Sequence, residues 1–123
     1  MRSLITMIAV VMTLTISAAQ SETIPERLID DLQKDLAITE FQAAAIAGNL
    51  AQETGNFRVL QEQKGTGFGY SQWQGRRLAS FYLFADEIGD RTGYEANYGF
   101  LLKEIKGVEA GTLVKLRRTT TLD

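Results

Sequence analysis

Cysteine and histidine are both absent from the 123-residue sequence. Without cysteine there can be no disulfide framework and no thiolate metal site, and without histidine there can be no histidine-based triad and no imidazole metal ligand. The glycine loops that bind nucleotide phosphates, GxxxxGK[ST] and GxGxxG, are also missing. Chemistry must therefore be carried by carboxylates, amides, hydroxyls, lysine, arginine and aromatic side chains, and we expect neither a metal nor a cofactor.

A strong charge of either sign is lacking as well, because 13 Lys and Arg residues oppose 15 Asp and Glu residues, for a formal net charge of −2. Bulk charge of this size and sign does not attract nucleic acid or anionic membranes. With 45% hydrophobic and 23% charged residues, the composition is that of one small globular domain with an ordinary core. The sequence does not indicate an oligomeric state.

Residues 1–19 have the layout of a secretory signal peptide. Basic Arg2 precedes an apolar run over residues 4–16, and small residues up to Ala19 precede polar Gln20. The apolar run is short for a membrane span, so we favour cleavage after Ala19 over an uncleaved anchor. The remaining domain, residues 20–123, would then be exported to the periplasm or the extracellular space with no stable membrane span.

The pattern of residues 20–123 indicates a helical chain with one non-helical segment. Apolar periodicity and end signals predict helices over residues 25–36, about 39–54, 76–88 and 94–106, with a further helix start at 111–116. The intervening stretch is polar and rich in glycine, which favours a short hairpin or irregular β-like lobe. The ending resembles the cap of a further helix, so an incomplete C-terminus is one interpretation of it.

The second predicted helix, at about residues 39–54, carries a carboxylate near its end. Thr39 followed by Gln42 has the form of a capping box, and a glycine supplies the stop. The helix is apolar nearly all round, so we expect it to be the central, buried helix. Glu53 falls three residues after Leu50 and seven after Ile46, which places it on the same face as two large aliphatic groups.

Glu53 would therefore be a carboxylate among aliphatic groups at a helix C-terminus. Partial burial and the partial negative charge of the helix end both disfavour its ionised form. A carboxylic acid that stays protonated near neutral pH can donate a proton to a leaving oxygen, as glycoside cleavage requires of its general acid. The alternative, which position alone favours, is a solvated glutamate at a fraying helix end.

The glycine-rich stretch supplies candidate sugar contacts. Exposed rings cover sugar faces and amides bond to hydroxyls, so Tyr70, Gln72 and Trp73 would suit the wall of a sugar-binding cleft. The alternative is that Trp73 packs the lobe onto the helices. Glu62 is the only acid between Glu53 and the next predicted helix. It is a candidate second carboxylate, acting as base or electrostatic partner, and its alternative is a solvated side chain.

Three stretches of the sequence form a recognisable set: GNLAQETGNF at residues 48–57, GYSQWQGR at 69–76 and NYGFLLKEIKG at 97–107. Together they resemble the phage tail lysozyme family of the lysozyme-like superfamily, which is related to the lytic transglycosylases. The resemblance covers roughly residues 35–123. Asn97 stands where the family commonly has glutamine.

The resemblance implies a mainly α (α+β) fold, with helices around a central buried helix and a small β or irregular lobe that forms a cleft. It also implies a peptidoglycan substrate, with Glu53 as the catalytic acid and Gln72 lining the cleft. Our first hypothesis is an exported muramidase that cleaves the MurNAc–GlcNAc β-1,4 bond. Without a second carboxylate, a lytic transglycosylase that uses Glu53 alone is as plausible. A non-catalytic peptidoglycan-binding module is the remaining alternative.

Overall fold

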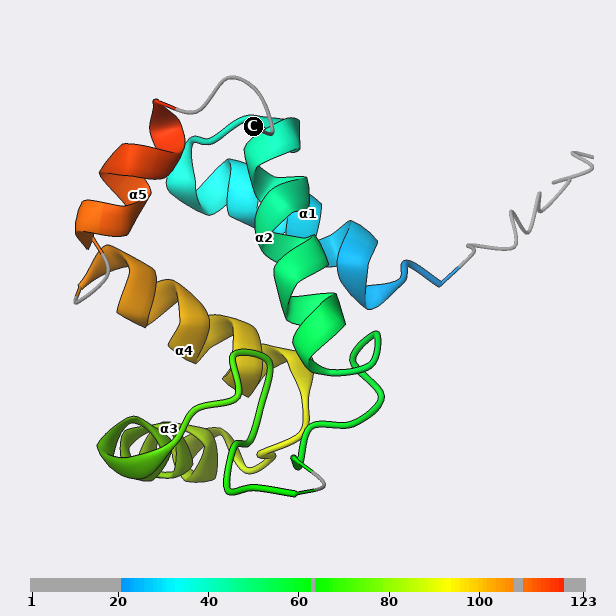
Figure 1. Ribbon diagram of the computed structural model, residues 1–123, viewed down its shortest axis with the longest axis vertical. Helices are drawn as coiled ribbons and strands as arrows, with labels where there is room; N and C mark the ends of the chain where they lie inside the picture. The colour runs from blue at the N-terminus through cyan, green and yellow to red at the C-terminus, as the bar shows by residue number, and fades with distance from the viewer. Residues whose placement is uncertain (1–20, 63, 108–109, 119–123) are drawn as a thin grey trace, which may run out of the picture.

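The computed structural model describes residues 21–62, 64–107 and 110–118, and within these ranges the chain forms helices joined by one irregular lobe (Figure 1). The helices are α1 (Ile24–Leu36), α2 (Glu40–Glu53), α3 (Gly75–Ile88), α4 (Tyr94–Lys106) and α5 (Ala110–Arg117). Their bounds agree with the predicted ranges to within one or two residues. The prediction of a mainly α fold is confirmed.

The lobe between α2 and α3 contains no strand in its described residues. Two isolated antiparallel bridges hold it together, one between Gln61 and Phe68 and one between Phe68 and Trp73. The irregular version of the predicted lobe is therefore the correct one. The predicted signal peptide and the last five residues lie outside the described residues. No helix in the part of the chain that the structure describes is long and apolar enough to cross a membrane.

The capping box predicted at Thr39 is present. The Thr39 hydroxyl accepts a hydrogen bond from the Gln42 N–H at 3.1 Å, and Gln42 Oε1 accepts one from the Thr39 N–H at 3.0 Å. Gln42 is buried, and its Nε2 donates to the Leu116 carbonyl at 2.8 Å. The residue that caps α2 therefore also ties α5 to it.

One apolar core joins the helices and the lobe. It includes leucines of α1, small residues of α2, and aromatic residues of the lobe, α3 and α4: Leu28, Leu32, Leu36, Ala43, Ala47, Leu50, Phe57, Tyr70, Trp73, Phe81, Ala85, Ala96, Phe100 and Leu101. The Trp73 ring stacks on Phe81 at 4.6 Å between centroids and meets Phe100 edge-on at 5.0 Å. Such aromatic pairs stabilise beyond the area they bury, so they fix the lobe to α3 and α4.

Helix α2 is buried on one side only. Gln42, Ala43, Ala47 and Leu50 are buried, whereas Ala44, Gly48 and Gln52 are exposed. The prediction of a central, buried helix therefore holds for only one side of α2. The reason is the composition of the helix. Alanine and glycine carry so little apolar area that the sequence does not show which side of the helix packs against the core.

Candidate functional site

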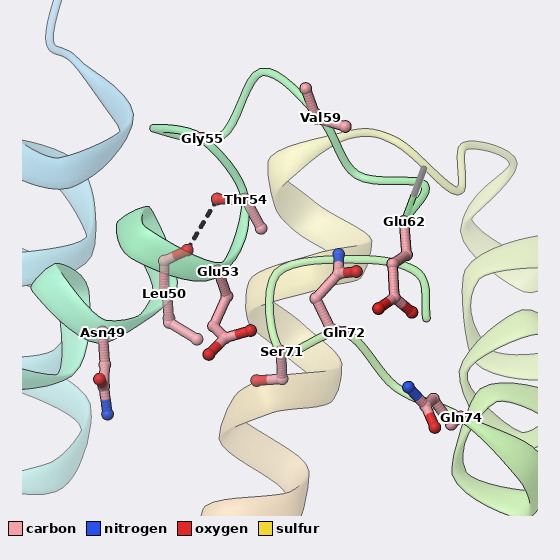
Figure 2. Close-up of a pocket in the computed structure, with 10 residues that line it drawn as sticks. All are labelled: Asn49, Leu50, Glu53, Thr54, Gly55, Val59, Glu62, Ser71, Gln72 and Gln74. Carbon is pink, nitrogen blue, oxygen red and sulfur yellow. Dashed lines mark hydrogen bonds between the residues drawn. The ribbon is translucent and has the colours of Figure 1, made fainter. Parts of the chain in front are cut away.

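A cleft of about 710 Å³ lies between the C-terminal end of α2 and the lobe (Figure 2). Most of its lining side chains are polar: Asn49, Leu50, Glu53, Thr54, Gly55, Val59, Glu62, Ser71, Gln72 and Gln74. The residues before position 56 belong to α2 and its end, and the others come from the lobe. The structure thus brings together three of the predicted site residues, Glu53, Glu62 and Gln72.

Glu53 is the last residue of α2 and directs its carboxylate into the cleft (Figure 2). The residue is exposed. The predicted partial burial of its side chain, on a face shared with Ile46 and Leu50, is therefore wrong. Leu50 turns into the core, with only 7% of its surface exposed. Glu53 follows it at the rim of the helix end, where the cleft opens.

The backbone reverses direction immediately after Glu53. Gly55, Asn56 and Phe57 all have left-handed φ values, of 54°, 60° and 64°. Glycine adopts this conformation without steric cost, but it is unfavourable for a residue with a side chain, so Asn56 and the bulky Phe57 mark a strained segment. Backbone strain of this kind concentrates at functional sites, where the surrounding structure holds it in place.

Thr54 holds this reversal together, and the sequence analysis did not identify its role. Its hydroxyl donates to the Leu50 carbonyl at 2.7 Å and accepts from the Phe57 N–H at 2.9 Å, in a fully buried position. A hydroxyl residue directly after the last helical position was the available signal, because such side chains bond back to the carbonyl four residues earlier.

Tyr70 and Trp73 do not form a sugar-binding wall. They are only 1% and 0% exposed. Burial raises the pKa of Tyr70 to about 12. The prediction that these rings contact substrate is wrong, and the turn geometry explains why: Tyr70 and Trp73 point into the core, while Ser71 and Gln72 line the cleft. The alternative interpretation, in which Trp73 packs the lobe onto the helices, is the correct one.

Gln72 lines the cleft, but its amide nitrogen is used inside the lobe. Nε2 donates to the Leu60 carbonyl at 2.8 Å and to the Gly69 carbonyl at 2.9 Å. These bonds hold Gln72 in a left-handed conformation, with φ of 50°. The nitrogen is therefore committed to positioning the turn. A contact between Gln72 and sugar stays a prediction that concerns its carbonyl oxygen.

Glu62 lines the same cleft from the lobe (Figure 2). Its Oε2 accepts a hydrogen bond from the Gly67 N–H at 3.0 Å, and its own N–H donates to the Gly67 carbonyl at 2.9 Å. The carboxylate thus closes a loop of the lobe as well as facing the cleft. Its role as a second catalytic group stays a prediction.

Asn97 of α4 holds the turn at residues 69–72 in place from the buried side of the lobe. It is fully buried, and its Oδ1 accepts from the Tyr70 N–H at 3.1 Å. Its Nδ2 donates to the Arg91 and Gly93 carbonyls at 3.0 and 2.8 Å. From the sequence, Asn97 was noted only as standing where the family commonly has glutamine, although it falls on the predicted helix 94–106 among large apolar residues. A buried amide among such residues must find partners, and that requirement was the missed signal.

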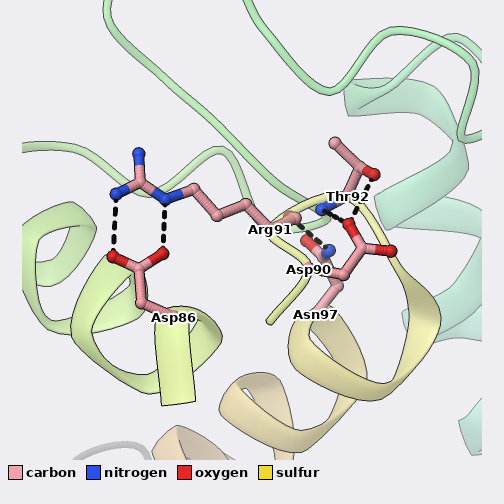
Figure 3. A network of polar contacts seen from close by, with 5 residues as sticks. All are labelled: Asp86, Asp90, Arg91, Thr92 and Asn97. Carbon is pink, nitrogen blue, oxygen red and sulfur yellow. Dashed lines mark hydrogen bonds and ion pairs between the residues drawn. The ribbon is translucent and has the colours of Figure 1, made fainter. Parts of the chain in front are cut away.

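Charged side chains stabilise the connection between α3 and α4, to which Asn97 also bonds (Figure 3). Arg91 donates to both carboxylate oxygens of Asp86 at 2.8 and 2.9 Å. Asp90 Oδ1 accepts from the N–H and the hydroxyl of Thr92, each at 2.8 Å. These contacts hold the connection between α3 and α4, and that connection supplies the two carbonyls to which the Asn97 side chain donates.

Glu104, two helical turns after Asn97, provides a second attachment of the lobe to α4. Its Oε1 accepts from Trp73 Nε1 at 2.5 Å, and Arg77 donates to its two oxygens at 2.8 and 2.7 Å. Burial raises the pKa of Glu104, but the hydrogen bonds from Arg77 and Trp73 lower it further, so the pKa lies below its ordinary value. Glu104 thereby joins the lobe, α3 and α4.

Comparison with known families places these observations in context. A family model described as phage tail lysozyme matches residues 26–123, which include all of the cleft residues. No curated protein and no solved structure matches the chain. The family description denotes a lysozyme-like function, which acts on peptidoglycan. Because the family model matches most of the sequence, the chain belongs to the phage tail lysozyme family.

Proposed function

We propose that the protein hydrolyses the β-1,4 bond between MurNAc and GlcNAc in peptidoglycan, with Glu53 as the general acid. The observation that carries this proposal is the position of Glu53, which projects from the end of α2 into an open cleft with a polar lining. A glycan strand must enter a site along its length, so an open cleft suits it better than a closed pocket. An acid on one wall can then reach the oxygen between two sugars.

The bound glycan supplies the burial that Glu53 lacks in the free protein. Sugar rings seated over the carboxyl group exclude water from it, and exclusion of water favours the protonated acid. Glu53 then donates its proton to the glycosidic oxygen as the bond from that oxygen to the anomeric carbon breaks. The leaving sugar departs as an alcohol, and Glu53 is left as a carboxylate.

A second carboxylate in the same cleft favours hydrolysis over transglycosylation. Glu62 is suited to take a proton from a water molecule as that water bonds to the anomeric carbon, which yields a reducing sugar. A carboxylate has about four acceptor positions, so the bond from Gly67 leaves capacity for this role. If Glu53 acts alone, the C6 hydroxyl of MurNAc bonds to its own anomeric carbon, returns a proton to Glu53 and gives an anhydro product.

Mass analysis of muropeptides released from purified peptidoglycan tests this function. We expect reducing products from the wild type, and a rate lower by about 10² to 10⁴ for Glu53→Gln, which keeps the shape but cannot transfer the proton. Glu87→Gln, an exposed glutamate of α3 outside the cleft, is the matched control and should retain the wild-type rate.

The products of Glu62→Gln decide between the two reactions. A large loss of reducing product supports Glu62 as the base, whereas anhydro products from both the wild type and Glu62→Gln would identify a transglycosylase. Release of muropeptides by Glu53→Gln at the wild-type rate would remove Glu53 from the mechanism. Binding to peptidoglycan without any released product would identify a non-catalytic module.

We further propose that residues 1–19 direct export, so that the protein meets peptidoglycan outside the cytoplasm. The support is the basic start, the apolar run and the small residues that end at Ala19. N-terminal sequencing of the exported protein should begin at Gln20. Exported protein that still begins at Met1 would contradict the cleavage.

A further inference from the structure

We infer that Ser71 contacts the substrate, and that its hydroxyl forms a hydrogen bond with the glycan beside the bond that Glu53 cleaves. This inference rests on the proposed function. Ser71 and Glu53 line the same cleft from different elements, the lobe and α2 (Figure 2). A glycan seated in the cleft therefore lies within reach of both walls.

The turn that carries Ser71 is closed at its base by backbone hydrogen bonds. Phe68 and Trp73 exchange two of them, at 3.1 and 2.8 Å, and the Gln72 N–H donates to the Gly69 carbonyl at 3.1 Å. Ser71 lies at the tip that these bonds enclose. Its backbone direction is thus set by the turn and not by substrate.

The turn is also fixed to α4 on both sides of Ser71. The preceding residue, Tyr70, donates its N–H to Asn97, and Trp73 donates its indole N–H to Glu104. Gly69 allows this close approach, because a Cβ at that position would lie 2.5 Å from the Trp73 ring. A side chain on a turn held this firmly is preorganised, so it loses little conformational freedom when it binds a ligand.

Ser71 offers the cleft a hydroxyl that can both donate and accept, whereas Gln72 has only its carbonyl oxygen left for a ligand. The Tyr70 ring is in the core, and the Gln72 nitrogen bonds to two carbonyls of the lobe. Ser71 is only half-buried, and its hydroxyl makes no hydrogen bond to another residue within the described ranges. A hydroxyl both donates and accepts, which matches the hydroxyl and acetamido groups of a peptidoglycan strand.

Cleavage rates with soluble, uncrosslinked glycan strands test this inference. We expect Ser71→Ala to lower kcat/KM by about 3- to 10-fold, the effect of one neutral hydrogen bond. Ser71→Thr, which keeps the hydroxyl, should recover most of the loss. Ser80→Ala, an exposed serine of α3 outside the cleft, is the matched control and should equal the wild type. Melting temperatures of all three variants should stay within about 2 °C of the wild type, as for surface substitutions.

Binding to insoluble peptidoglycan separates this inference from the proposed function. In the Glu53→Gln background, adding Ser71→Ala should weaken binding by a similar factor. Unchanged cleavage and binding in the Ser71→Ala variants would overturn the inference alone, as would a loss that Ser71→Thr does not recover and that accompanies a lower melting temperature. A Glu53→Gln variant that cleaves at the wild-type rate would instead overturn the proposed role of Glu53.

Discussion

Replacement of Asn97 by alanine tests whether the cleft depends on a buried amide of α4. The change removes three hydrogen bonds, to the Tyr70 N–H and to the Arg91 and Gly93 carbonyls. The Gly93 carbonyl keeps a partner, because it also accepts from the Asn97 backbone N–H at 3.2 Å. The Tyr70 N–H and the Arg91 carbonyl lose the Asn97 side chain that pairs them, and it is these two losses that set the cost.

A buried group that loses its partner costs about 1 to 3 kcal/mol. The Tyr70 N–H is buried and carries this full cost, whereas the bond to the Arg91 carbonyl is only partly buried and carries less, so we expect Asn97→Ala to lower the free energy of unfolding by about 2 to 4 kcal/mol. A domain of roughly 100 residues loses about 4 to 8 °C of melting temperature per kcal/mol, so the expected decrease is on the order of 10 to 30 °C. This is a large share of a total stability of about 5 to 15 kcal/mol.

Thermal unfolding followed by circular dichroism and by tryptophan fluorescence measures this effect. Trp73 is the only tryptophan of the chain, so fluorescence reports on the core beside the cleft turn. Asn49→Ala, at an exposed position of α2, is the matched control and should change stability by no more than about 0.5 kcal/mol. A melting temperature of Asn97→Ala within about 2 °C of the wild type would refute the reasoning.

Two further predictions concern the same turn. Gly69→Ala should destabilise the fold by about 3 kcal/mol or more, because φ is 84° and the new Cβ would lie 2.5 Å from the Trp73 ring. The control, Gly48→Ala, has no atom within 4 Å of its added Cβ and should stabilise the α2 helix by roughly 0.5 to 1 kcal/mol. Equal urea midpoints for the two variants would contradict the steric argument. The pKa of Glu104 is lowered from an ordinary value of 4.5, so its stabilising contribution is present above that value and is lost as pH falls through the lower pKa of the folded state. The stability difference between wild type and Glu104→Gln should therefore be constant near neutral pH and shrink below pH about 4.5, and a difference that persists unchanged to pH ~3 would exclude this linkage.

Local signals in the sequence were sufficient to place the helices. The capping box at Thr39 and the glycine after Ile88 depend on contacts within a few residues, so periodicity and end signals located these helix ends to within one or two residues. The motif around Glu53 also predicted the family and the helix end that carries the acid. These features are encoded locally, because helix hydrogen bonds and caps join residues that are close in sequence.

The direction of each side chain in the lobe was decided only by tertiary structure. Tyr70 and Trp73 are buried because α3 and α4 offer them an aromatic core, and Ser71 lines the cleft because the turn between them is held by Asn97 and Glu104. Asn97 and Glu104 lie more than 25 residues from their partners in the turn, and no local pattern specifies these contacts. The exposure of Glu53 has the same origin, since the packing of α2 on α1 determines which side of that helix remains open to the cleft.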